Sequence, residues 1–128
     1  MTLAHLTIAT QDSQSTTEFL QAVFDWPLVH RPANVDPTTY WLDIGQGQQV
    51  HVLLVADFQV SPFEKEFGRH FAFLFPAAKL KQIRERLAQR NVEVLPPIRP
   101  TPFERFFFQD PNGYMFEIID QDKFVQET

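Results

Sequence analysis

Apolar and polar residues alternate over short stretches along most of the chain, whereas two segments repeat with the period of an α-helix. The helical stripes predict one helix that begins near Asp12 and another that begins at Pro76. The alternating stretches predict strands at residues 3–9, 28–31, 39–44, 49–55, 69–75, 92–95, 103–109 and 114–119. The chain is therefore expected to run strand, helix, strand, strand, strand, and then to repeat that order as an α+β protein.

The stretch from Phe106 to Asp120 carries the strongest local signal, because two apolar arms flank an Asp-Pro-Asn-Gly turn. Glu117 falls in the middle of the otherwise apolar second arm. Burying an unpaired carboxylate is costly, so Glu117 needs a cation, a hydrogen-bond donor or a metal. Arg105 and Arg69 are its candidate partners within the chain.

The repeated order has a constant spacing, which indicates an internal duplication. His70 follows His5 by 65 residues, Glu117 follows His51 by 66, and the two turn glycines are also 66 residues apart. The chain is predicted to be a single domain, residues 1–128, made of two repeats. The repeats cover about 1–57 and 69–120, and residues 58–68 link them.

The duplication places four polar residues at equivalent positions, each opposite the more apolar stripe of its strand. If the concave faces of two curved sheets meet, His5, His51, His70 and Glu117 converge. Three imidazoles and one carboxylate suit Zn, Fe, Mn, Ni or Co, and they argue against Ca and Mg. Each residue alone is more often structural, but four matched positions favour a metal site. His30 has no counterpart and is expected on the surface or at a pocket rim.

The composition narrows the class of protein. The chain has 128 residues, of which 44% are hydrophobic and 14% aromatic, enough for one domain with a core. A net charge of −5 with scattered basic residues argues against a nucleic-acid partner. The chain has no cysteine, which excludes disulfides and thiolate metal sites. It shows no signal-peptide pattern or membrane-spanning apolar run, so we expect a cytoplasmic protein without membrane partners.

The motifs resemble those of the vicinal oxygen chelate superfamily, which includes glyoxalase I, methylmalonyl-CoA epimerase, fosfomycin resistance enzymes, bleomycin resistance proteins and extradiol dioxygenases. The resemblance runs from His5-Leu6-Thr7-Ile8, through segments 47–53 and 68–73, to the signature at residues 110–117. It implies two βαβββ modules that form a cup-shaped open β-barrel, with a helix packed outside each. It also implies a homodimer that binds a small-molecule substrate.

By this resemblance His5, His51, His70 and Glu117 fall where family members carry metal ligands, and Glu117 is also the expected proton acceptor. Glyoxalase I carries Glu at the position that His51 holds here, which argues against methylglyoxal detoxification. Trp41 and Arg105 are candidate substrate contacts. The alternative to a substrate contact is core packing for Trp41 and a surface position for Arg105.

Three functions compete at this point. The first is a metal-dependent enzyme that chelates vicinal oxygens of its substrate and stabilises an oxyanion, as a lyase, isomerase or dioxygenase. The alternative is a non-catalytic binding or drug-resistance protein of the bleomycin-resistance kind. The third is a structural member in which the four polar residues bond one another. The sequence selects neither the reaction nor the metal.

Overall fold

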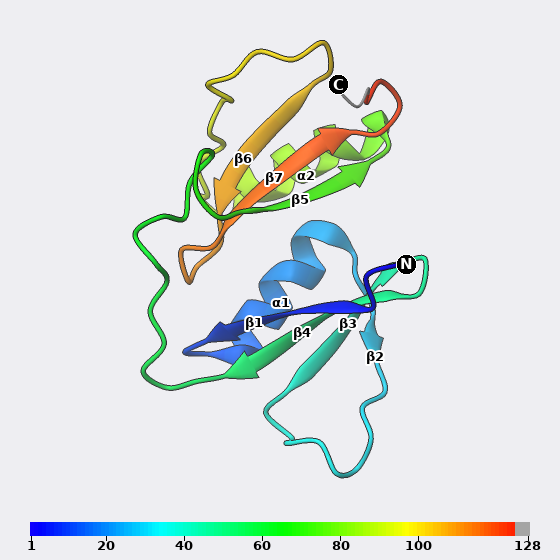
Figure 1. Cartoon of the computed structure of the whole chain (residues 1–128), viewed down its shortest axis with the longest axis vertical. Coiled ribbons are helices and arrows are strands. Elements are labelled where there is room, and N and C mark those ends of the chain that lie inside the picture. Colours follow the sequence, from blue (N-terminus) through cyan, green and yellow to red (C-terminus); the bar gives the residue numbers. More distant parts are fainter. Residues whose placement is uncertain (125–128) are drawn as a thin grey trace. The chain divides into compact units, whose positions relative to one another are not determined.

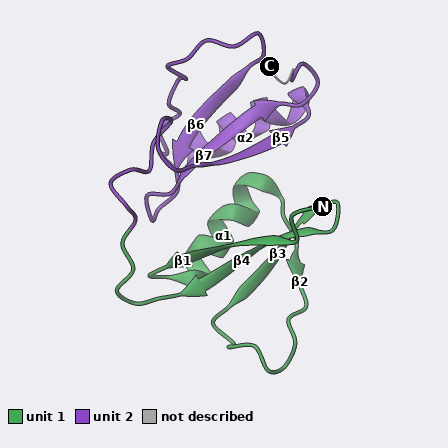
Figure 2. Cartoon of the chain, in the orientation of Figure 1, with its two compact units in different colours: residues 1–59 green, residues 60–128 purple. Residues whose placement is uncertain are grey.

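The computed structural model describes residues 1–124, so the last four residues of the predicted domain lie outside the described part. The chain divides into two compact units, one of residues 1–59 and one that begins at Val60 (Figure 2). Over residues 1–124, each unit contains one helix and one open β-sheet (Figure 1). The α+β class and the two modules are confirmed. The cup that the modules would form together stays a prediction.

The first unit follows the predicted element order. Its elements are β1 (His5–Thr10), α1 (Ser13–Phe24), β2 (Leu28–Val29), β3 (Tyr40–Gly45) and β4 (Gln48–Leu54). They form a sheet of order β1-β4-β3-β2, in which β1 runs parallel to β4. Helix α1 begins where Asp12 accepts a hydrogen bond from the Ser15 backbone N–H at 3.0 Å. It ends at Asp25, whose φ of 62° is left-handed.

The second unit contains β5 (Phe71–Phe75), α2 (Ala77–Gln89), β6 (Arg105–Gln109) and β7 (Met115–Asp120). Its sheet has the order β5-β7-β6, with β5 parallel to the central strand β7. The strand expected at residues 92–95 is reduced to one bridge, in which Leu95 exchanges two backbone hydrogen bonds with Phe107. Pro96 and Pro97 follow directly and have no N–H to donate, so the ladder cannot continue.

In each unit the helix packs on one face of the sheet. In the first unit that face buries Ile8, Leu42, Val50 and Val52 together with Leu20 of α1. The second unit buries Leu80, Ile83 and Leu87 of α2 with strand residues Phe106, Phe108, Phe116 and Ile118. Strand residues alternate between faces, so the candidate site residues lie on the opposite face of each sheet. Neither helix within residues 1–124 is both long and apolar enough to cross a membrane.

The strand registers of the two modules agree with the duplication. In the first module Thr7 of β1 pairs with His51 of β4. In the second, Ala72 of β5 pairs with Glu117 of β7. These pairs are separated by 65 and 66 residues, the same spacing as the histidines and the turn glycines. His51 and Glu117 therefore occupy equivalent positions in two copies of one backbone.

Candidate functional site

His51 lies in a stack of three rings in the first unit. Trp41 stands directly opposite His51 on β3, and the two rings lie 4.4 Å apart at an angle of 8°. On the other side the His5 ring lies 3.9 Å away at 14°. Burial, and secondarily the charge of His5, lower the pKa of His51, which favours the neutral form of its imidazole. Two metal-competent side chains are thus adjacent on this face of the first sheet.

His70 and Glu117 form the corresponding pair in the second unit. His70 precedes β5, and its Nε2 lies 3.0 Å from Oε1 of Glu117. Glu117 is only 7% exposed. The His70 ring also meets Phe107 edge-on, with centroids 5.5 Å apart. The other ring nitrogen, Nδ1, is buried and has no hydrogen-bond partner among the described residues.

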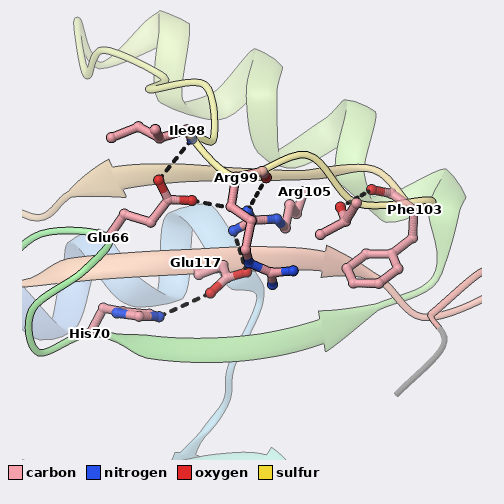
Figure 3. Close-up of polar contacts among 8 residues, drawn as sticks. Glu66, His70, Ile98, Arg99, Phe103, Arg105 and Glu117 are labelled. Carbon is pink, nitrogen blue, oxygen red and sulfur yellow. Dashed lines mark hydrogen bonds and ion pairs between the residues drawn. The ribbon is translucent and has the colours of Figure 1, made fainter. Parts of the chain in front are cut away.

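Arg105 is the cation that faces Glu117, as Figure 3 shows. Its Nη1 donates to Oε2 of Glu117 at 3.2 Å. Arg105 is opposite Ile119 in the β6–β7 register, so Glu117 is its diagonal neighbour, within reach of a long side chain. Arg69, the other candidate partner, instead bonds Glu64 at 2.6 Å. Arg105 is 5% exposed, so the alternative that placed it on the surface is wrong.

The guanidinium of Arg105 contacts two further groups. Its Nη2 donates to the backbone carbonyl of Arg99 and lies 3.0 Å from Oε1 of Glu66 (Figure 3). The contact with Glu66 is an ion pair whose alignment falls short of a hydrogen bond, since Oε1 of Glu66 has no hydrogen-bond donor within residues 1–124. The Nε–H of Arg105 is buried and has no partner among residues 1–124.

The separation of His70 from Glu117 is compatible with two ligands of one transition-metal ion. Two donors at right angles, each about 2.1 Å from one ion, lie about 3.0 Å apart. The Nε2 of His70 and Oε1 of Glu117 have this separation, 3.0 Å. Neither unit by itself, over the described residues, gathers three or more His, Cys, Asp or Glu side chains. The set of four ligands therefore requires both pairs, and it stays a prediction.

Two residues beside the pairs did not stand out in the sequence. Phe107 faces Glu117 across β6 and β7, as Trp41 faces His51, and the same 66-residue spacing would have identified it. Glu66 lies in an irregular segment that has no periodic pattern, so nothing in the sequence marked it. Trp41, which was expected to contact substrate, contacts His51, and its substrate contact stays a prediction.

Comparisons with known proteins agree with this architecture. The model of the glyoxalase/bleomycin resistance protein/dioxygenase superfamily matches residues 2–118. No curated protein sequence matches the chain. Among solved structures, the fosfomycin resistance protein FosX from Mesorhizobium loti is 24% identical with a TM-score of 0.70, over 93% of this chain and 91% of that one. The oxidase ChaP-H2 is 20% identical with a TM-score of 0.73, over 94% and 93%.

A third similar structure contains a metal. FosX from Listeria monocytogenes, in complex with Mn(II) and a sulfate ion, is 21% identical with a TM-score of 0.71. The alignment covers 93% of this chain and 89% of that chain. At such identities these likenesses to solved structures establish the fold alone.

Proposed function

Because the chain belongs to the glyoxalase/bleomycin resistance protein/dioxygenase superfamily, we propose that it is a metal-dependent vicinal oxygen chelate enzyme. One observation carries the proposal. Both modules hold a pair of metal-competent side chains at equivalent backbone positions, His5 with His51 and His70 with Glu117. A solved structure of similar fold, FosX from Listeria monocytogenes, contains Mn(II).

The proposed ligands are His5, His51, His70 and Glu117, contributed by one chain or by two chains of a homodimer. A bound divalent ion of Zn, Fe, Mn, Ni or Co would act as a Lewis acid toward two neighbouring oxygens of a small substrate. The three imidazoles would donate as neutral groups, which is the form that the lowered pKa of His51 favours. Six-coordinate binding would leave two positions for substrate.

Glu117 is the residue proposed to move a proton. Its Oε1 faces His70 while its Oε2 is held by Arg105, so the carboxylate is oriented before substrate arrives. A positioned carboxylate can accept a proton from a carbon or oxygen beside the chelated group. Trp41 is proposed to line the substrate pocket, and Arg105 to contact a substrate anion. Reactions of the lyase, isomerase and dioxygenase types all remain candidates.

A metal-free binding protein is the second candidate, and one observation favours it. Glu117 already has Arg105 as a counter-charge, so the buried carboxylate does not depend on a metal for neutralisation. In this case the same fold would hold a small molecule without turnover, as bleomycin resistance proteins do. A cytoplasmic location is proposed for either function.

Metal analysis of protein purified without chelator tests the proposal. We expect a stoichiometric first-row metal in the wild-type protein, and its loss in His70→Ala and in Glu117→Gln. His30→Ala is the matched control, because His30 is an exposed histidine outside both pairs. If His70→Ala and Glu117→Gln keep the metal, the ligand assignment is wrong. A wild-type protein without metal would favour the binding protein. Thermal-shift screening with dicarbonyls, hydroxy acids, catechols and thiol conjugates would then narrow the substrate.

A further inference from the structure

Glu66 takes part in a buried cluster of three charges with Arg105 and Glu117. The Arg105 guanidinium lies between the two carboxylates, 3.0 Å from Glu66 Oε1 and 3.2 Å from Glu117 Oε2. The side chains of Arg105, Glu66 and Glu117 are 3%, 11% and 9% exposed. Charges so far from solvent are weakly screened, so each strongly affects the others.

Backbone hydrogen bonds hold two members of the cluster, Glu66 and Arg105. Oε2 of Glu66 accepts a hydrogen bond from the Ile98 backbone N–H at 2.7 Å (Figure 3). The Arg99 carbonyl accepts a hydrogen bond from Nη2 of Arg105. Backbone groups thus hold the outer carboxylate and the guanidinium, and Arg105 cannot turn away from Glu117 without losing these contacts.

The formal charges show what Glu66 contributes. Arg105 and Glu117 alone form a neutral pair, which attracts a divalent cation weakly. With Glu66 the cluster carries a net charge of −1. The oxygen of Glu117 that does not contact Arg105 is Oε1, which faces His70, so the excess negative charge is available on the side of the proposed ligands.

We propose that Glu66 is a positioning residue that neutralises Arg105 and so preserves the negative charge of Glu117 for the metal. This inference rests on the proposed function, since it assumes that Glu117 is a metal ligand. Arg105 then orients the carboxylate through Oε2, and Glu66 offsets the electrostatic cost of having a cation next to a metal ligand. Groups that hold metal ligands in this way typically change metal affinity by about 10- to 100-fold when they are removed.

Glu64 provides a matched control from the same segment. Its side chain is 6% exposed and it pairs with an arginine, Arg69, at 2.6 Å. The Arg69 side chain is 69% exposed, so solvent screens its charge. Glu64→Gln and Glu66→Gln remove the same charge from positions two residues apart, but only Glu66 contacts the arginine that holds Glu117.

The experiment measures the Mn(II) affinity of the metal-stripped 128-residue chain by calorimetry at constant ionic strength. Glu66→Gln should bind Mn(II) roughly tenfold more weakly than wild type, and Glu64→Gln should bind it like wild type. The double variant Glu66→Gln/Arg105→Gln should bind more tightly than Glu66→Gln, because removing the cation restores the net charge of −1. A purely structural role of Glu66 predicts the opposite for the double variant.

The outcomes separate this inference from the proposed function. If wild type binds Mn(II) and Glu66→Gln binds it equally well, the role of Glu66 is wrong and the metal site stands. Equal weakening in Glu64→Gln and Glu66→Gln, or a double variant weaker than Glu66→Gln, also overturns it. If wild type binds neither Mn(II) nor any of the other proposed ions, Zn, Fe, Ni and Co, the proposed function and this inference both fail. Denaturant unfolding of each metal-free variant shows whether a loss of affinity reflects a loss of fold.

Discussion

Arg105 and Glu117 form a buried ion pair across neighbouring strands, with Nη1 of the arginine 3.2 Å from Oε2 of the glutamate. Breaking a buried pair on one side leaves a charge without compensation, which typically costs about 3–5 kcal/mol. We therefore expect Arg105→Ala to lower the free energy of unfolding by that amount, measured by denaturant titration of the metal-free protein. Loss of Arg105 also leaves Glu66 without its cation.

The control for this prediction is Arg84→Ala. Arg84 pairs with Glu104 at 2.8 Å, but the two side chains are 40% and 52% exposed. Exposed pairs contribute at most about 1 kcal/mol, and the contact of Arg84 with the Phe106 ring adds a similar amount. Equal destabilisation by the two substitutions would show that burial of the Arg105 pair has no energetic significance.

Removal of the Trp41 ring should weaken metal binding. Trp41 is partly exposed, and its ring supports one face of the His51 imidazole. Aromatic pairs contribute about 0.5–1.5 kcal/mol, which corresponds to a roughly two- to tenfold change in affinity. Trp41→Leu should lower Mn(II) affinity within this range, and Trp41→Phe, which retains a ring, should lower it less. Identical affinities of the two variants would contradict a role for stacking.

We expect the buried carboxyl group of Asp110 to give the free energy of unfolding an unusual dependence on pH. Its Oδ1 accepts hydrogen bonds from the backbone of Asn112 and Tyr114, while Oδ2 is buried and has no partner among the described residues. Burial raises the pKa of Asp110 from 3.8 to about 6. Since the native state holds its proton more tightly than the unfolded state, stability falls as pH rises between these values. The loss is roughly 3 kcal/mol at most.

The measurement compares the unfolding free energies of wild type and Asp110→Asn from pH 3.8 to 7. The wild type should lose stability relative to the variant as pH rises. When the measurement is extended below pH 3.8, Asp36→Asn should show the opposite trend, because hydrogen bonds from Thr38 lower the pKa of Asp36. A carboxylate of that kind stabilises the native state above its unfolded pKa and loses this contribution as pH falls. A constant difference between wild type and Asp110→Asn would exclude the raised pKa.

The two turn glycines, at equivalent positions in the modules, should respond differently to substitution. Gly47 has a φ of +75° with nothing within 4 Å of an added Cβ, whereas Gly113 has a φ of +93° and its Cβ would meet Val60 at 2.9 Å. Each Ala substitution should cost about 1 kcal/mol or more from backbone strain. Gly113→Ala should cost roughly 1 kcal/mol more because of the contact. In a Val60→Ala background, thermal unfolding should show that the extra cost disappears.

The alternation of strand residues predicted the faces of both sheets correctly. It separated Glu117 from Phe116 and Ile118, which the structure buries against α2. The spacing of the duplication predicted that His51 and Glu117 are equivalent, and the strand registers agree. These features are local or periodic, and a sequence records them directly.

The partner of Glu117 could not be selected from the sequence. The register of the hairpin depends on how the Asp-Pro-Asn-Gly turn closes, and a shift of one residue would move Arg105 to the other face. Glu66 lies in an irregular segment and contacts Arg105. A hydrogen bond from the backbone N–H of Ile98, 32 residues away, holds its carboxylate there. Contacts of this kind depend on tertiary packing alone.

The equivalence of the two modules has a consequence for redesign. The strand registers place His51 and Glu117 at equivalent positions, yet among the candidate site residues the charged ones, Arg105 and Glu117, both lie in the second module. Arg105 corresponds through the 66-residue spacing to Thr39, which is neutral. The double substitution His51→Glu with Glu117→His would keep the same set of metal-binding side chains. It would, however, leave the guanidinium of Arg105 next to an imidazole, without the carboxylate that neutralises it. A redesign that moves the carboxylate to the first module must therefore also move the arginine that pairs with it.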